Sequence, residues 1–235
     1  MQSIVIFIIL SIISSILISN FYKLVIKKEA RDFSIKEYLK NFKIENIDLK
    51  YVIIFFILYK IIVNNFSWIS IVTIVPCITA LILAFITDIK YMIIPDTSSI
   101  VIILSAIINL IYNYSSENLI SSILGFIIGG VTLFVIDYIF KLVTKSDGFG
   151  YGDMKLLASI GLYLGYKSII VIMILSIFIS AIFSLIYLVS KKIKAIKNVY
   201  IPFGPFIVIS TLIVFIVPAT EIINLYFYFI ERIIN

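Results

Sequence analysis

Residues 69–87 are ISIVTIVPCITALILAFIT, nineteen consecutive positions without a charge, and the aspartate Asp88 follows directly. A helix needs about 20 predominantly apolar residues to cross the hydrocarbon core of a membrane. The rest of the chain has the same character, because 62% of its 235 residues are hydrophobic and its mean hydropathy is +1.19. Soluble domains are only about 45–50% apolar. The composition therefore indicates a helical membrane protein.

The apolar segments predict an all-α fold, a polytopic transmembrane helix bundle of about eight spans. The first segment has no basic region before it and no small-residue cleavage site, so we expect a retained helix rather than a signal peptide. The last segment is expected to break at Pro218, because proline cannot continue the helical hydrogen-bond pattern. The predicted spans are Ile4–Tyr22, Tyr51–Val63, Ile69–Thr87, Ser98–Tyr112, Leu119–Val143, from after Asp153 to Leu164, Ser168–Ser190 and Phe206–Tyr228.

Lysine and arginine are distributed unevenly between the predicted loops. With eight alternating spans, 16 of the 19 basic residues fall on one side, and only Lys60, Lys167 and Arg232 fall on the other. Basic loops stay in the cytoplasm, so Asp88 and the other loop aspartates are expected to face it. The basic loop 23–50 has apolar residues at roughly helical spacing. It is predicted to be a short amphipathic cytoplasmic helix on the anionic membrane surface, with a solvated linker as the alternative.

Several kinds of chemistry are excluded by the residues that the chain lacks. It has no histidine and a single cysteine, Cys77, so serine–histidine triads, cysteine–histidine pairs and four-cysteine zinc sites are impossible within it. We therefore expect no metal and no cofactor. The net charge of +6 is explained by the basic loops, so nucleic acid is not an expected partner, whereas membrane lipid is.

Two acidic motifs interrupt the apolar sequence. The first is Asp88–Ile89–Lys90, followed by Pro95–Asp96, and the second is Gly148–Phe149–Gly150–Tyr151–Gly152–Asp153–Met154–Lys155. The alternating glycines predict a tight turn that delivers Asp153 to the start of the next helix. Taken alone, Asp88 also fits an interfacial charge paired with Lys90, and the glycine segment also fits a flexible loop.

Two neighbouring carboxylates form a hydrolytic device that needs neither metal nor histidine. They share one proton, because like charges at close range cannot both ionise cheaply. The ionised member takes a proton from water, and the protonated member polarises a carbonyl. Peptide hydrolysis by Asp88 and Asp153 is therefore the chemistry that the composition leaves open.

The two motifs, in this order and at this spacing, resemble those of the type IV prepilin peptidases, which are polytopic GxGD aspartic peptidases. The resemblance covers about residues 70–210 and includes Ala158–Gly165 and the segment Ile201–Phe206. It implies a single integral membrane peptidase domain over residues 1–235, with Asp88 and Asp153 as the catalytic pair. It also implies Lys90, Asp96, Asp147, Gly150, Gly152 and Lys155 as supporting residues and Pro202, Phe203, Gly204 and Pro205 on the substrate side.

The resemblance further implies what the enzyme acts on and where. Members of this family cleave the basic leader of prepilins or pseudopilins at the cytoplasmic face of the bacterial inner membrane. Many also have a cytoplasmic loop with two zinc-binding CxxC pairs and methylate the new N-terminus with S-adenosylmethionine. Residues 23–50 contain no cysteine, so the chain resembles a short form without zinc, and methylation does not follow from the resemblance.

A proton- or ion-coupled transporter that uses the same aspartates is the alternative from a different class. Transporter sites lie near the middle of the membrane and often between internal repeats. This chain has no evident repeat, and Asp88 and Asp153 lie at the ends of predicted spans, which favours the peptidase. Asp137, inside the fifth span, is expected to pair with Lys141 four residues on, or to help hold the bundle.

Overall fold

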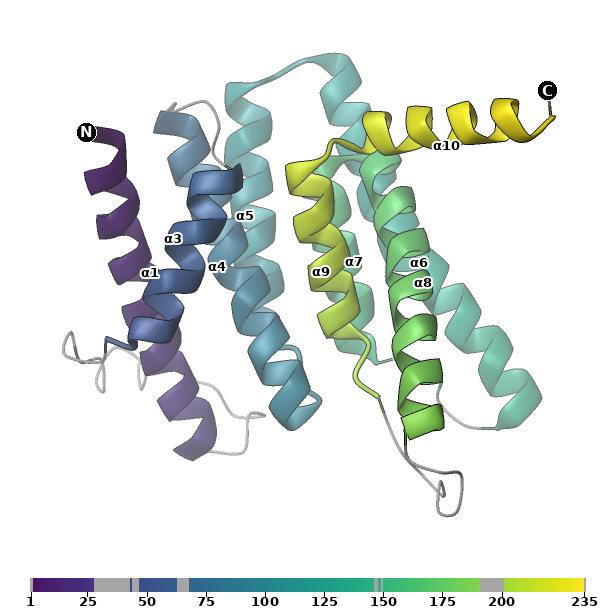
Figure 1. Cartoon of the computed structure of the whole chain (residues 1–235), viewed down its shortest axis with the longest axis horizontal. Helices are drawn as coiled ribbons and strands as arrows, with labels where there is room; N and C mark the ends of the chain where they lie inside the picture. Colours follow the sequence, from purple (N-terminus) through teal and green to yellow (C-terminus); the bar gives the residue numbers. More distant parts are fainter. Residues whose placement is uncertain are drawn as a thin grey trace. The chain divides into compact units, whose positions relative to one another are not determined.

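The computed structural model describes residues 2–27, 43, 47–62, 68–145, 148, 150–190 and 201–234. Helices dominate this part of the chain, and it contains no strand, so the all-α prediction is confirmed (Figure 1). The helices are α1 (Gln2–Lys27), α3 (Leu49–Ile62), α4 (Trp68–Tyr91), α5 (Asp96–Tyr112), α6 (Ser116–Thr144), α7 (Tyr151–Leu164), α8 (Tyr166–Ser190), α9 (Gly204–Ile216) and α10 (Ala219–Ile234).

The chain divides into two compact units, Met1–Leu83 and Ala84–Asn235. In the first, polar side chains on three helices bond to one another. The Tyr59 hydroxyl lies 2.6 Å from Ser14 Oγ and 3.1 Å from Thr79 Oγ1. Lipid offers polar groups no hydrogen bonds, so bonds of this kind join helices within a membrane. The second unit contains the end of α4 and all of α5–α10, and both candidate carboxylates belong to it.

Close contact between α6 and α7 organises the second unit. A Cβ atom added at Gly161 would overlap the carbonyl oxygen of Gly125, and one added at Gly129 would lie 2.5 Å from the carbonyl oxygen of Leu157. In a membrane, helices associate through such close backbone packing, because lipid tails are as apolar as leucine. These contacts hold the second half of α7 close against α6.

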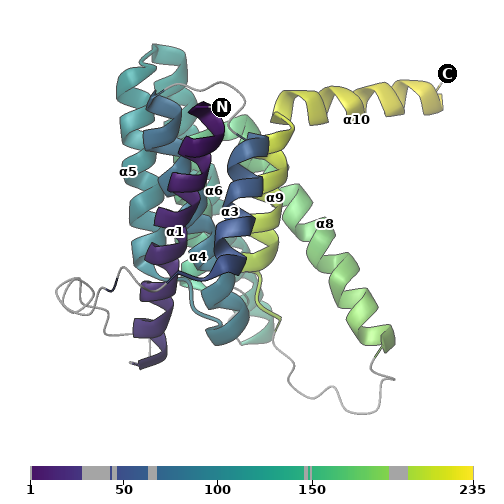
Figure 2. The same cartoon turned by 60° about the vertical axis from the view of Figure 1, so that its left-hand side comes forward.

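The chain turns sharply where a proline was expected to break the last span. Helix α9 ends at Ile216, α10 begins at Ala219, and the two helices are bent by 87° (Figures 1 and 2). Pro218 lies in this break and has no N–H for a helical hydrogen bond. The break therefore follows the predicted proline position.

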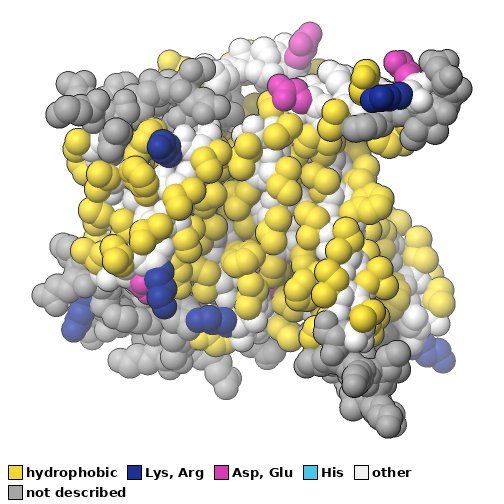
Figure 3. All heavy atoms as spheres, viewed as in Figure 1, with side chains coloured by type: hydrophobic (Ala, Val, Ile, Leu, Met, Phe, Trp, Pro, Cys, Tyr) yellow, Lys and Arg dark blue, Asp and Glu magenta, His cyan; other side chains and the backbone are white. Residues whose placement is uncertain are grey.

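The surface of the described helices has the character expected in lipid. On the face that Figure 3 shows, hydrophobic side chains cover the helices, and the charged side chains lie near helix ends. Three helical segments are long and apolar enough to cross a membrane, Ile71–Tyr91, Ser116–Thr144 and Tyr166–Val189, and the bent pair α9–α10 would make a fourth. The number of spans, eight, stays a prediction. The amphipathic loop also stays a prediction, because most of it lies outside the described residues.

Candidate active site

Asp88 lies one turn before the end of α4. The helix continues to Tyr91, further than the predicted end at Thr87. The Asp88 side chain is buried, with 6% of its surface exposed, and its Oδ2 atom accepts a hydrogen bond of 3.0 Å from the backbone N–H of Gly204. An N–H donor stabilises the ionised form of a carboxylate. The beginning of α9 therefore supports a negative charge on Asp88.

Asp153 lies in the first turn of α7. Gly150 caps this helix, and its carbonyl oxygen accepts a hydrogen bond of 3.1 Å from the Asp153 N–H. The Asp153 side chain is 8% exposed, and its Oδ1 atom has no hydrogen-bond partner among the described residues. A buried carboxylate oxygen without a partner is costly, so this atom is available to a water molecule or a substrate.

The two carboxylates line one cavity of about 370 Å³. Burial, and secondly the negative charge of Asp88, raise the pKa of Asp153 to about 7, although a hydrogen bond from the Gly150 backbone acts in the opposite direction. Near neutral pH, Asp153 therefore exchanges a proton easily beside Asp88, whose carboxylate accepts the hydrogen bond from the Gly204 N–H. This is the environment in which one carboxyl group works as an acid and its neighbour as a base.

Ile94 packs closely against the backbone of two glycines, Gly152 in α7 and Gly204 in α9. A Cβ atom added at Gly204 would lie 2.9 Å from Ile94 Cδ1 and 2.6 Å from Asp88 Oδ2, and one added at Gly152 would lie 3.0 Å from Ile94 Cβ. Only glycine allows the backbone to approach this closely. The glycines therefore let the first turn of α7 and the start of α9 close around Asp88.

Only some of the predicted substrate-side residues line the cavity. Pro202 and Phe203 line the cavity, whereas Gly204 bonds to Asp88 and Pro205 is buried in the first turn of α9. The cavity also includes residues that the sequence analysis missed: Met92, Ser180, Ser184, Ile201 and Phe206. The two serines are four positions apart in an apolar helix, and that spacing is the signal that could have identified them.

The predicted supporting residues are also divided. Gly150 lines the cavity, and Gly152 contacts Ile94. Gly148, which was not among the predicted supporting residues, also lines the cavity. Lys155 Nζ and Asp96 Oδ1 form an ion pair of 2.8 Å, but their side chains are 55% and 67% exposed. Lys90 is exposed near the end of α4. Asp147 lies outside the described residues, so its predicted role stays a prediction.

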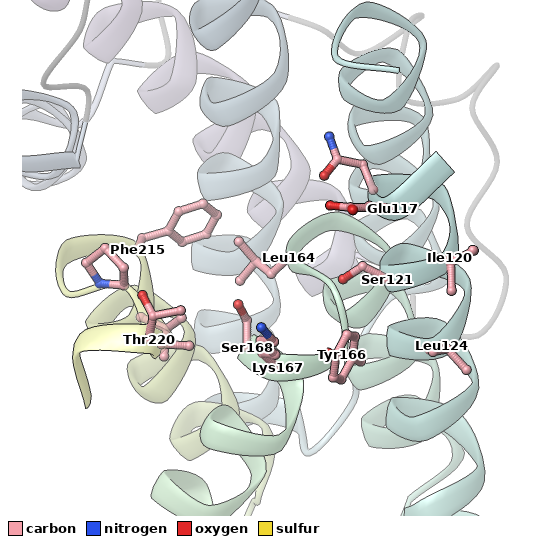
Figure 4. Close-up of a pocket in the computed structure, with 14 residues that line it drawn as sticks. Glu117, Ile120, Ser121, Leu124, Leu164, Tyr166, Lys167, Ser168, Phe215 and Thr220 are labelled. Carbon is pink, nitrogen blue, oxygen red and sulfur yellow. The ribbon is translucent and has the colours of Figure 1, made fainter. Parts of the chain in front are cut away.

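A second and larger cavity of the same unit, about 730 Å³, lies where α6, α8 and α10 begin (Figure 4). Its charged lining residues, Glu117 and Lys167, are both exposed. It contains neither aspartate of the first cavity. Across the described part of the chain, no group of three or more His, Cys, Asp or Glu residues could hold a metal ion.

Comparisons with known proteins place these residues in a family. The model of the type IV leader peptidase family matches residues 75–185, which include both aspartates. A prepilin leader peptidase/N-methyltransferase of Vibrio cholerae is 30% identical over 179 residues, which are 73% of this chain and 67% of that protein. No solved structure matches the chain.

Other relatives match over a smaller part of their length. Proteins with the same description from Dichelobacter nodosus and Aeromonas salmonicida are 33% and 31% identical over 151 and 124 residues. The matched region covers 64% and 52% of this chain but only 50% and 41% of those proteins. The chain therefore matches about half the length of these relatives.

Proposed function

Because the chain belongs to the type IV leader peptidase family, we propose that it is a membrane aspartic endopeptidase that cleaves the leader of prepilins or pseudopilins. The observation that supports this activity most strongly is the pair of buried carboxylates, Asp88 and Asp153, on one cavity. Charged groups at the ends of membrane helices are costly, and two of the same sign in one cavity indicate a function.

The two aspartates take different roles in the proposed reaction. Asp88, which accepts a hydrogen bond from the Gly204 N–H, is the base that removes a proton from the attacking water. Asp153, whose pKa of about 7 keeps a large fraction protonated near neutral pH, donates a hydrogen bond to the scissile carbonyl oxygen. As the water attacks, one of its protons goes to Asp88, and Asp88 then passes this proton to the departing amine. The amide bond breaks, and both carboxyl groups return to their starting protonation states.

The proposed substrate side of the cavity is the segment at the start of α9. Pro202 and Phe203 line it beside Asp88, and their apolar surface suits the beginning of the hydrophobic helix that follows a prepilin leader. The basic leader suits the negative charge of the dyad, since complementary charges steer a partner and fix its register. The basic loops support a cytoplasmic orientation of the site in the inner membrane.

The proposal concerns the peptidase activity alone. The described relatives are named for both a peptidase and an N-methyltransferase, but the loop 23–50 contains no cysteine. A cysteine-based zinc site therefore cannot form there. The single integral membrane peptidase domain that we propose uses its own carboxylates and no cofactor.

Co-expression with a prepilin tests the proposal. The chain should convert the prepilin into a product shortened by its leader, which mass spectrometry identifies. Asp88→Asn and Asp153→Asn should each abolish this conversion, because an amide can neither take the water proton nor donate the shared acidic proton. Membrane fractionation and folding in detergent should be unchanged.

Two outcomes would overturn the proposal. Processing at the normal rate by either Asn variant would show that the dyad is not the catalytic pair. No shortened product from the wild-type chain, together with proton-coupled uptake that both variants abolish, would favour the transporter alternative.

A further inference from the structure

Asp137 is a buried acid of α6 that the proposed chemistry does not use. Its side chain is 4% exposed. The Oδ2 atom lies 3.0 Å from Lys141 Nζ, which confirms the predicted pairing of these two residues. The Oδ1 atom accepts a hydrogen bond of 2.8 Å from the backbone N–H of Gly148, eleven positions along the chain. The carboxylate therefore connects α6 to the glycine segment before α7.

The last turns of α6 contact this glycine segment at both of its ends. A Cβ atom added at Gly148 would lie 2.9 Å from Phe140 Cδ1, so the Gly148 backbone lies directly against α6. At the other end, the Lys141 ammonium is 5.6 Å from the centre of the Tyr151 ring, within the range of a cation–π interaction. Asp137 and Lys141 together thus hold the segment from Gly148 to Tyr151.

We propose that Asp137 is a positioning residue for Asp153, an inference that rests on the proposed peptidase function. The segment that it holds includes Gly150, which caps α7 and whose carbonyl oxygen accepts a hydrogen bond from the Asp153 N–H. Glycines leave a backbone many conformations, so this segment needs an external contact to hold one of them. The Asp137–Gly148 bond supplies that contact and fixes where Asp153 enters the cavity.

Stability alone does not explain an ion pair whose carboxylate is buried and whose ammonium is half-buried. Replacing such a pair by apolar residues is often neutral or stabilising, because desolvating two charges costs as much as their attraction returns. An apolar pair would not offer Gly148 an acceptor. The property of Asp137 that the site uses is therefore its carboxylate oxygen, which accepts the hydrogen bond from Gly148. The positive charge of Lys141 offsets the negative charge of Asp137.

Two matched double variants separate the acceptor from the charge. Asp137→Asn/Lys141→Met removes both charges and keeps a carbonyl oxygen for the Gly148 N–H, whereas Asp137→Leu/Lys141→Met removes the acceptor as well. We expect kcat for prepilin cleavage to be about tenfold to a hundredfold lower in the Leu variant than in the Asn variant, because a small displacement of a catalytic group has that effect. KM should be unchanged. Lys145→Met makes the same lysine substitution at the exposed C-cap of α6, away from Asp137; it is the control and should cleave normally.

Hydrogen exchange provides a measurement that does not depend on the Leu variant folding well. In the wild-type chain, the Gly148 amide should exchange slowly, and Asp137→Asn should retain part of this protection. Fast exchange of the wild-type amide, or equal kcat in the two folded double variants, would overturn the positioning role. The positioning role would also be overturned if the thermal midpoint of the Leu variant fell so far that unfolding alone accounted for its lost activity.

The same assay separates this inference from the proposed function. If Asp88→Asn still cleaves the prepilin, the peptidase dyad itself is wrong. If Asp88→Asn is inactive and the two double variants have the same kcat, the dyad stands and the positioning role of Asp137 is rejected.

Discussion

Two cavities of the second unit lie toward opposite ends of α9 and differ in what they bury. The cavity at its start includes Phe206 and is about 370 Å³, and the cavity at its end includes Val214 and is about 730 Å³. The smaller cavity holds two carboxylates that are 6% and 8% exposed. In the larger one, the charges of Glu117 and Lys167 are exposed. A search by volume alone would choose the larger cavity as the candidate active site. The burial of two like charges instead favours the smaller cavity, at the start of α9.

The physical cost of each arrangement explains the difference. Glu117 lies in the first turn of α6, where the helix dipole favours a negative charge. Such a residue stabilises its own helix and needs no further role. Asp88 and Asp153 are instead two buried carboxylates on one cavity, and burial, followed by the charge of Asp88, raises the pKa of Asp153. The following predictions test whether function follows this difference.

The largest effect is expected from removing the dyad. Asp88→Asn and Asp153→Asn should each lower the rate of leader cleavage by about a thousandfold or more, since groups that act as one unit show losses of this size. The double variant should be no slower than either single variant, because one missing member already disables the pair. Single-turnover cleavage by the purified chain measures these rates. If the loss in the double variant equals the product of the two single losses, the two residues act independently.

The next effect concerns the contact between Gly204 and Asp88. In Gly204→Ala, the new Cβ would lie 2.6 Å from Asp88 Oδ2, so the carboxylate must shift and its N–H bond must lengthen. We expect a loss of about tenfold to a hundredfold in kcat. Gly130→Ala is the matched control, because its Cβ would meet only Ala158 Cβ at 3.3 Å. Equal activity in the two variants would show that the Gly204 bond does not support catalysis.

The pH dependence of cleavage should follow Asp153. Its pKa is raised to about 7, so the protonated form that the reaction requires is present below this pH and is lost above it. The rate should therefore fall about tenfold for each pH unit well above 7. Initial rates between pH 6 and 9, with unfolding monitored in parallel, test this. A rate that stays constant up to pH 9 would contradict the acid role.

The smallest effect is expected in the larger cavity. Glu117→Gln and Lys167→Met change its charges without touching the dyad, and each should alter cleavage by less than about twofold, as surface substitutions usually do. The same prepilin assay measures both variants. A tenfold loss in either would mean that the larger cavity takes part in the reaction.

Local features of the fold were predictable from the sequence. The break at Pro218 and the pairing of Asp137 with Lys141 depend on residues within one or two helical turns. Small residues in an apolar segment are typical of tight helix packing, but they do not reveal that Gly125 is the partner of Gly161. Helix positions followed the apolar pattern, but α7 has only 14 residues and α5 only 17, so length does not identify these helices as spans.

The candidate site depended on contacts between distant parts of the chain. The motifs identified Asp88 and Asp153, but the bond between Gly204 and Asp88 joins residues 116 positions apart. Nothing in the local sequence distinguishes a glycine on the substrate side from one that bonds to a carboxylate of the proposed dyad. Ile94 was likewise a member of an apolar run until its packing against Gly152 and Gly204 became visible.

The central claim is that Asp88 and Asp153 act as one electrostatically coupled pair. Infrared spectroscopy of the purified chain can follow the protonated carboxyl band during a pH titration. We predict a band that titrates near pH 7, is absent in Asp153→Asn, and moves to lower pH in Asp88→Asn, because removing the neighbouring charge makes ionisation of Asp153 easier. A titration of Asp153 that is unchanged in Asp88→Asn would show that the two carboxylates do not interact, and would contradict the dyad.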